Sequence, residues 1–315
     1  MRSVNIPIGF LALSLVTFAS LASVPVARAQ IFVTNSGNNT VSRISSDGKT
    51  ITTLVLASAG LNKPFGIAFG AGGDLFVSNY GGTTVSRISP LTGQIISTIT
   101  GIPAPFYSTY RESTGDLFVG SHVGRGTIDR IDSSGQVSTF ATGPNYYPRG
   151  LAFTPNGSLF VGDDGGEIRR IDASTGTSSP VINIGGFNQS IYGLVSDTTG
   201  NLYAVDGNST AISRITTGAT PTVTRFASGF NLPEGLTFLP NGNLLVTDAG
   251  GIKQVTPDGV VSVFASGGGL NRPSGIAVAG SAATVPESGS LALASVALIA
   301  LVGIVRRKNC VARSA

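Results

Sequence analysis

The chain of 315 residues has one cysteine, Cys310, one histidine, His122, and no tryptophan. A single cysteine excludes an intrachain disulfide, so the fold has to be stabilised by its core. A single histidine gives no basis for a Ser-His-Asp triad, and no thiol lies within the repeats described below. Phosphate-loop and dinucleotide fingerprints are also absent, because the Gly-rich segments join strands rather than a strand to a helix.

Charge is scarce as well, at 11% of residues, although the sequence pI is about 9.4. Between Gln30 and Gly280 there are 14 Lys and Arg against 15 Asp and Glu, so the net charge there is 14 − 15 = −1. The basic excess lies in the terminal segments. This distribution argues against a nucleic-acid partner.

What the chain has in abundance is glycine, with 43 residues, and a repeat. Gly150–Ile171 contains three short apolar runs separated by turn-forming residues, which predicts a three-stranded meander. The middle run recurs at Ile31, Leu75, Leu117, Leu159, Leu202 and Leu244, in steps of 44, 42, 42, 43 and 42 residues. A fixed period in the forties built from strands and turns is typical of β-propeller blades.

The two ends of the repeat region are incomplete in complementary ways. The chain enters at a second strand, Ile31–Val33, and leaves with a first strand, Gly275–Val278. We therefore predict an all-β, six-bladed β-propeller over residues 30–280, whose first blade is closed by residues 274–279.

The flanking segments have different compositions. Residues 1–29 have an apolar run followed by Ala27-Arg28-Ala29, which predicts a cleaved signal peptide, with an uncleaved membrane anchor as the alternative. Residues 281–287 form a linker that ends in Val285-Pro286-Glu287. Residues 288–305 are apolar or small and long enough to span a membrane as a helix. The basic tail, residues 306–315, would stay cytoplasmic; its cluster is Arg306, Arg307 and Lys308.

This C-terminal arrangement resembles the PEP-CTERM sorting tail of exported bacterial proteins. The resemblance implies recognition by an exosortase and delivery to the cell surface or extracellular matrix. The tail departs from the motif at Ser288, where the third position is proline in that family. The repeats resemble NHL-type propellers at Val33–Asn39 and Val77–Gly82, and two enzyme families, gluconolactonases and virginiamycin B lyases, share the ring.

Antiparallel pairing brings two sets of residues to one mouth of the ring. One set precedes each innermost strand and the other follows each second strand, with His122 just beyond. The first set is Phe65, Tyr107, Arg149, Tyr192, Glu234 and Ser274, and the second is Asn35, Asn79, Ser121, Asp163, Asp206 and Asp248.

Two interpretations of the acidic members remain open. Asp163, Asp206, Asp248 and Glu234 are suitable ligands for a hard cation such as Ca²⁺. Alternatively, each aspartate bonds amides of its own turn. The lactonase resemblance implies a metal held by acidic and Asn side chains, of which Glu234 alone has a counterpart here. The lyase resemblance implies a catalytic histidine, whereas a solvated turn histidine is the commoner explanation of His122.

An arginine also recurs before a core isoleucine on five of the third strands. These arginines form a stripe for acidic polysaccharide, or each lies across the neighbouring blade with its stem packed and its head group paired; they are Arg43, Arg87, Arg130, Arg170 and Arg214. The sequence favours a monomeric, exported binding or scaffold module that holds a glycan, peptide or matrix component. A divergent metal-dependent lactonase or lyase is the alternative, and a purely architectural surface protein is a third.

Overall fold

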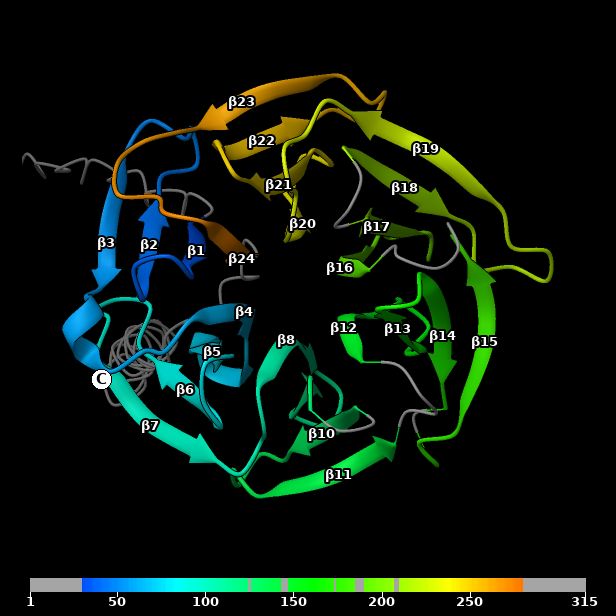
Figure 1. The fold of residues 1–315 in the computed structure, drawn as a ribbon, viewed down its shortest axis with the longest axis horizontal. Coiled ribbons are helices and arrows are strands. Elements are labelled where there is room, and N and C mark those ends of the chain that lie inside the picture. The colour runs from blue at the N-terminus through cyan, green and yellow to red at the C-terminus, as the bar shows by residue number, and fades with distance from the viewer. Residues whose placement is uncertain are drawn as a thin grey trace, which may run out of the picture.

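Six four-stranded antiparallel sheets surround a common axis in the computed structural model, which describes residues 30–123, 126–142, 147–172, 174–184, 190–206 and 210–279 (Figure 1). One strand of each sheet lies at the axis and another at the rim. The predicted six-bladed β-propeller is confirmed. In these described ranges the helical elements are two short 3-10 turns, η1 (Ala57–Ala59) and η2 (Ala71–Gly73), so none of them could cross a membrane.

The blades follow one another along the chain, each written here from axis to rim. The first is β24 (Pro273–Val278), β1 (Ile31–Asn35), β2 (Thr40–Ile44) and β3 (Ile51–Val55). The second is β4 (Pro64–Phe69), β5 (Leu75–Asn79), β6 (Thr84–Ile88) and β7 (Ile95–Thr100). The third is β8 (Pro105–Arg111), β9 (Asp116–Ser121), β10 (Thr127–Ile131) and β11 (Val137–Thr142). The fourth is β12 (Pro148–Phe153), β13 (Leu159–Asp163), β14 (Glu167–Ile171) and β15 (Ser178–Asn183). The fifth is β16 (Ile191–Ser196), β17 (Leu202–Asp206), β18 (Ala211–Ile215) and β19 (Val223–Ser228). The sixth is β20 (Leu236–Phe238), β21 (Leu244–Asp248), β22 (Gly251–Val255) and β23 (Val261–Ala265).

The ring closes in the first blade, where strands from the two ends of the repeat region pair. Ile31 is opposite Val278 and Val33 is opposite Ile276. The Ala279 amide donates a further hydrogen bond of 2.8 Å to the Gln30 carbonyl. The first blade therefore takes its axis strand, β24, from the other end of the repeat region. No strand edge is left open between the first and last blades.

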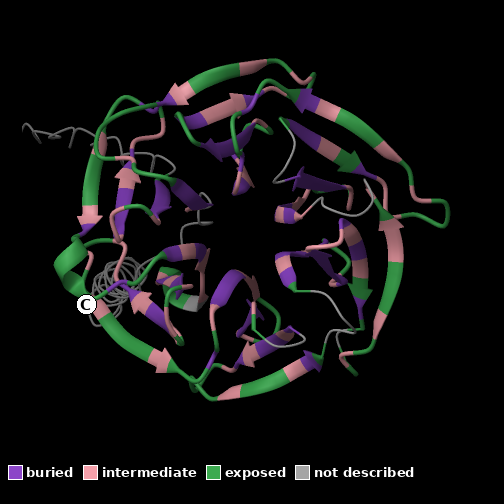
Figure 2. Cartoon of the chain, in the orientation of Figure 1, coloured by how far each residue is buried: buried purple, intermediate pink, exposed green. Residues whose placement is uncertain are grey.

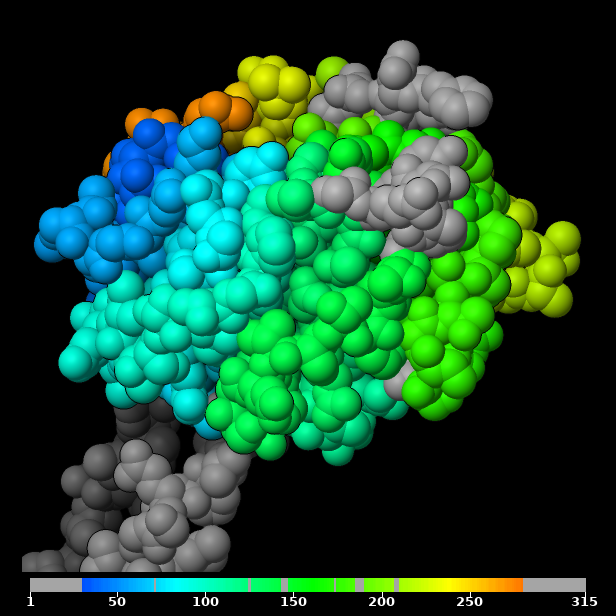
Figure 3. Space-filling view, turned by 60° about the horizontal axis from the view of Figure 1, so that its bottom comes forward, coloured from blue at the N-terminus to red at the C-terminus, as the bar shows by residue number. Residues whose placement is uncertain are grey.

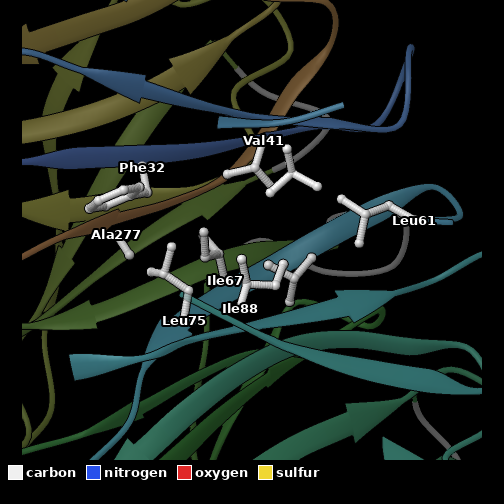
Figure 4. Close-up of a cluster of buried hydrophobic side chains, with 9 residues drawn as sticks. Phe32, Val41, Leu61, Ile67, Leu75, Ile88 and Ala277 are labelled. Atoms are coloured by element: carbon white, nitrogen blue, oxygen red, sulfur yellow. The ribbon is translucent and has the colours of Figure 1, made fainter. Parts of the chain in front are cut away.

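The core lies between neighbouring blades rather than within one blade. In one cluster, Phe32, Val41 and Ala277 of the first blade pack against Leu75 and Ile88 of the second (Figure 4). The axis strands and the two strands beside them carry most of the buried residues, whereas the rim strands are largely exposed (Figure 2). Each blade therefore depends on its neighbours for burial of its apolar faces.

Glycine lets the axis strands approach closely. A Cβ atom at Gly235 would lie within 2.3 Å of the Ser274 carbonyl oxygen, and one at Gly275 within 2.2 Å of the Phe65 carbonyl oxygen. Any side chain at these two positions would force the neighbouring axis strands apart.

Several predicted segments lie outside the described residues. They are the signal peptide (1–29), Val285-Pro286-Glu287, the apolar stretch 288–305 and the basic residues Arg306, Arg307 and Lys308.

Candidate functional site

An irregularity in five of the six axis strands shapes the mouth of the ring. In the second blade Pro64 is opposite Asn79 and Ile67 is opposite Val77, so Phe65 and Gly66 together face one residue, Ser78. A bulge of this kind turns the strand and redirects the side chain it carries. The same irregularity recurs at the matching place in the first, third, fourth and fifth blades.

The register corrects one predicted site position. In the third blade Pro105 is opposite Ser121 and Ser108 is opposite Val119, so Phe106 occupies the position of Phe65 and Tyr107 that of Gly66. The prediction that Tyr107 occupies this position was wrong by one residue, because it aligned Ser108 with the recurring glycine. The signal that identifies Phe106 is the proline before it, which also precedes Phe65 and Arg149.

Tyr107 instead extends across the axis. Its hydroxyl donates a hydrogen bond of 3.3 Å to the Ser274 carbonyl, which belongs to the first blade, two blades away. Burial raises the pKa of this phenol well above its usual value, and the nearby Glu234 carboxyl adds to the effect. Tyr107 therefore stays neutral as it joins the first and third blades.

Two asparagines that end second strands bind hydroxyls of their own hairpin and one backbone amide of the loop before the axis strand. The Asn79 amide nitrogen donates to the hydroxyls of Thr84 at 3.0 Å and Ser86 at 2.9 Å, while its oxygen accepts from the Asn62 amide at 3.2 Å. Asn35 makes the matching three bonds in the first blade, to Thr40, Ser42 and Asn271.

In the fourth and sixth blades, where aspartate replaces asparagine, a cation lies beside the carboxylate. Asp248, 1% exposed, accepts from the amides of Gly250 and Asn231, and Lys253 Nζ lies 2.9 Å from its Oδ2. Lys253 is opposite Val246, the place that Ser86 takes opposite Val77. The fourth blade is similar.

Asp163 accepts from the amides of Gly165 and Glu167, with Arg169 Nε at 3.9 Å. Burial raises the pKa of the Asp163 carboxyl. Asp206 is buried at the equivalent place in the fifth blade.

These contacts bear on the predicted cation site. Asp163, Asp206, Asp248 and Glu234 do not form a joint donor set, and nowhere in the described ranges do three or more Asp, Glu, His or Cys side chains gather closely enough to hold a metal ion. Asp248 is already bound by two backbone amides and Lys253, and Asp163 Oδ1 accepts from two turn amides, whereas Asp163 Oδ2 is buried without a hydrogen-bond partner. The described residues therefore do not fit a resident divalent cation.

The residues one position further along face the mouth. Tyr80, His122 and Asp164 follow Asn79, Ser121 and Asp163, and strand alternation points them away from the hairpins. They meet side chains from the axis strands, and we call this set the mouth cluster. Its members come from the second to fifth blades: Phe65, Tyr80, Phe106, His122, Arg149, Asp164 and Tyr192.

Aromatic rings form one side of the mouth cluster. Phe65 stacks on Phe106 with centroids 4.7 Å apart, and the Tyr80 ring meets both edge-on, at 5.3 and 5.2 Å. Tyr192 lies 6.0 Å from Phe106. Tyr147, 36% exposed, lies 4.5 Å from the His122 ring. Sequence reasoning missed Tyr80, Phe106 and Asp164.

Arg149 joins the aromatic and polar parts. Its guanidinium carbon lies 4.3 Å from the Tyr192 centroid and 4.9 Å from that of Phe106, and its Nε donates to Asp164 Oδ1. Its side chain is 12% exposed, and burial lowers the pKa of the guanidinium, which remains protonated at neutral pH. A cation between two ring faces and a carboxylate is held in one orientation.

His122 completes the network as a neutral group. Its Nε2 lies 3.2 Å from Asp164 Oδ2, its Nδ1 lies 3.5 Å from the Tyr80 hydroxyl, and its ring stacks on Phe106 at 5.7 Å. Burial, helped by the charge of Arg149, lowers the pKa of His122 from 6.5 to about 4. A carboxylate would ordinarily raise this pKa, but the charge of Asp164 is already balanced by Arg149.

Glu234 lies at the matching position of the sixth blade. One carboxylate oxygen, Oε2, is buried without a hydrogen-bond partner. Burial raises the pKa of the Glu234 carboxyl, while the Ser274 hydroxyl and the charges of Arg272 and Arg149 oppose the rise. This buried oxygen therefore has an unused acceptor position.

The fold and this mouth define the class of protein as a six-bladed β-propeller. No protein-family model matches the chain, and no curated protein matches it. Solved structures do resemble it. A chain of a nidogen/laminin complex is 16% identical with a TM-score of 0.70, over 80% of this chain and 99% of that one. Virginiamycin B lyase from Staphylococcus aureus is 21% identical with a TM-score of 0.60, over 80% and 88%. A putative gluconolactonase is 16% identical with a TM-score of 0.57, over 72% and 87%. At these identities the likeness is one of fold.

Proposed function

We propose that this protein is an exported binding module whose mouth cluster holds a sugar unit of a glycan at the cell surface or in the extracellular matrix. The observation that carries the proposal is the one-sided composition of the mouth. Aromatic rings and an oriented arginine come from the second to fifth blades, whereas the sixth contributes Glu234, with its unpartnered oxygen.

This combination matches the chemistry of a carbohydrate. The apolar face of a sugar ring packs on an aromatic side chain, and its hydroxyls need donors and acceptors held in fixed directions. Phe65 and Tyr192 are partly exposed, and Arg149, Asp164 and Glu234 supply polar groups beside them.

Delivery to the surface is part of the same proposal. The signal-peptide pattern, the apolar stretch 288–305 and the basic cluster after it support export, sorting by exosortase-type machinery and at least transient membrane attachment. We propose a monomer, because each strand of the ring is partnered within one chain.

A glycan array followed by titration calorimetry on the purified chain tests the binding proposal. Tyr192→Ala removes a ring against which Arg149 is ordered, and each lost aromatic contact costs about 1 kcal/mol, or about five-fold in affinity. The matched control is Tyr110→Ala, a half-buried tyrosine at the other end of β8. Equal losses in both variants, or the absence of any glycan ligand, would contradict the proposal.

The enzyme alternative has one specific observation in its favour. A buried carboxyl with a raised pKa, such as Glu234, is a common general acid or base. A divergent lactonase or lyase would lose turnover in Glu234→Gln, whereas a binding site keeps an acceptor oxygen in that variant. Hydrolysis or elimination by the wild type that disappears in Glu234→Gln, together with a stoichiometric metal, would favour the enzyme.

A further inference from the structure

Five of the six rim strands carry one extra residue at the same place in the register. In the third blade Ile128 is opposite Ala141, but the next residue, Asp129, is opposite Thr139. Phe140 has no partner strand residue, and it packs on the apolar cluster that the third and fourth blades share. The equivalent residues of four other blades pack on the cluster shared with the next blade around the ring; they are Leu54, Val181, Phe226 and Phe264.

The second blade lacks a bulged residue at this place. Val85 is opposite Ile99 and Ser86 is opposite Thr98, so β6 and β7 pair there without interruption. The bulge of β7 lies nearer the start of the strand, at Ile96, whose side chain is 50% exposed. The rim strand of the second blade therefore places no bulged side chain between the second and third blades.

The second strand of the same blade shows the effect. Phe76 is opposite Arg87 and is half-buried, whereas the residue at this position is buried in the other five blades: Phe32, Phe118, Phe160, Tyr203 and Leu245. Phe118 meets the bulged ring of Phe140 with centroids 4.9 Å apart, and the corresponding rings of the fifth blade lie at the same distance. In the second blade the place of that second ring is left without a side chain.

A pocket with a volume of about 150 Å³ lies there, between the second and third blades. These two blades meet side by side in the view of Figure 3, where their colours run from cyan to green. An apolar cavity of about 150 Å³ is large enough to take up a benzene ring. The walls are apolar and come from both blades: Phe76, Ile99, Tyr110, Leu117 and Ile131. The edge is polar, with Arg87, Ser97 and the turn 132–135.

The turn 132–135 lies further from its neighbour than the matching turns of two other blades. A Cβ atom at Gly93 would lie within 2.0 Å of the Leu54 carbonyl oxygen, and one at Gly176 within 2.2 Å of the Phe140 carbonyl oxygen. These turns therefore rest on the bulge of the preceding blade. A Cβ atom at Gly135, the matching glycine of the third blade, would meet nothing within 4 Å. The pocket is therefore open to a ligand between this turn and β7.

Both charged groups that line the pocket are already paired. Arg87 Nη2 lies 2.7 Å from Asp74 Oδ2, so the predicted pairing of this arginine is confirmed. Asp132 Oδ1 accepts from the Ser134 hydroxyl and from the amides of Ser134 and Gln136, and these bonds, that of the hydroxyl first, lower the pKa of the Asp132 carboxyl. The site therefore suits an uncharged ligand, because a charge placed in it would lose hydration without gaining a partner.

We propose that this pocket, which we call the seam pocket, binds a small uncharged aromatic molecule of about the size of phenol. Its ring would lie against Phe76 and Tyr110, as Phe140 lies against Phe118 in the next blade, and its hydroxyl would bond to the serine hydroxyls at the edge. Tyr110 and the mouth residue Phe106 stand at opposite ends of β8. The seam pocket is therefore separate from the mouth cluster, and it goes beyond the proposed mouth function.

The test is binding of three probes to the purified full chain, measured by saturation-transfer NMR titration. The probes are phenol, benzoate, and N-acetyltyrosinamide as a model of a tyrosine in a partner protein. We expect saturable binding of phenol and weaker binding of both other probes. Intermolecular NOEs from phenol to the Ile99 methyl groups and the Phe76 ring would locate the site in the wild type, so the result does not depend on the folding of a variant.

Two variants with the same substitution on β7 separate the seam pocket from its surroundings. Ile99→Phe fills the pocket from its wall and should abolish phenol binding. Ile96→Phe is the matched control, because Ile96 is exposed and lies outside the pocket, and it should bind phenol as the wild type does. Tyr192→Ala, in the mouth, should also leave phenol binding unchanged.

Failure of the wild type to bind phenol would overturn the proposal, and so would equal phenol binding by Ile99→Phe and Ile96→Phe. NOEs to mouth residues instead of Ile99 and Phe76 would have the same consequence. Benzoate that binds as tightly as phenol would contradict the uncharged ligand. Tighter binding of N-acetyltyrosinamide than of phenol would assign the seam pocket to a side chain of a partner protein instead of a small molecule.

Discussion

The pH dependence of stability should be governed in one window by His122. It is the only histidine of the chain, and its pKa falls from 6.5 in the free side chain to about 4 in the fold. Below pH 6.5 the unfolded chain takes up a proton on this imidazole, whereas the folded chain does so only near pH 4. The free energy of unfolding should therefore decrease as the pH falls from 6.5 to 4.

The size of the effect follows from the shift. A change from 6.5 to about 4, at about 1.36 kcal/mol per unit, corresponds to about 3 kcal/mol. His122 is 17% exposed, so its surroundings are mostly protein: the rings of Tyr80, Phe106 and Tyr147, and the Arg149–Asp164 pair. The neutral imidazole fits this environment, and a second cation beside Arg149 does not.

Urea unfolding of the wild type and of His122→Gln at pH 7, 6, 5 and 4.5 measures the effect. Between pH 7 and 4.5 the wild type should lose about 2 kcal/mol relative to the variant, most of the full effect, and the carboxyl groups common to both proteins cancel in the comparison. An NMR titration of the single imidazole gives its pKa directly. An imidazole that titrates near pH 6.5, or parallel pH profiles for the two proteins, would refute the reasoning.

Three further predictions concern the ring itself. Lys253→Met leaves Asp248, 1% exposed, without its cation and should cost about 3 kcal/mol in chemical denaturation, whereas adding Asp248→Asn should recover most of the loss; equal stability of single and double variants would be inconsistent with a buried ion pair. Gly235→Ala should lower stability by 1–3 kcal/mol, about 5 °C or less in melting temperature, because its Cβ would lie 2.3 Å from the Ser274 carbonyl oxygen; an unchanged melting curve would show that the axis strands separate freely. A chain that ends before Pro273 lacks β24. We expect it to lose the cooperative unfolding transition measured by circular dichroism, and a stable truncated ring would disprove closure by this strand.

The blade count and the closure could be predicted because they depend on periodicity. Each second strand begins with an apolar triplet about every 42 residues, and the unmatched strands at Ile31 and Gly275 require each other. The alternation of buried and exposed residues repeats in every blade, so the sequence shows the same pattern several times and the strands can be predicted from it.

The details of the mouth were not predictable in the same way. The bulge is the same in the second and third blades, but the hairpin between the axis strand and the second strand is one residue longer in the third, and Tyr107 stands where the other blades have glycine. Alignment on the glycine therefore selected Tyr107 rather than Phe106. Tyr80 and Asp164 were missed because the side chains before them, Asn79 and Asp163, were expected to face the mouth. In the structure those two side chains point into the hairpins, and the next residue faces the mouth instead. A signal for this did exist: Ser86 accompanies Asn79, and Lys253 accompanies Asp248 at the corresponding place.

The joining of Gln30 and Ala279 in the first blade has a consequence for how the ring can be handled. Because these residues are hydrogen-bonded neighbours, a short peptide could link them, and the chain could be cut instead at an exposed turn such as Leu91–Thr92. The permuted molecule would keep all six blades, and its new ends would lie in the second blade instead of the first.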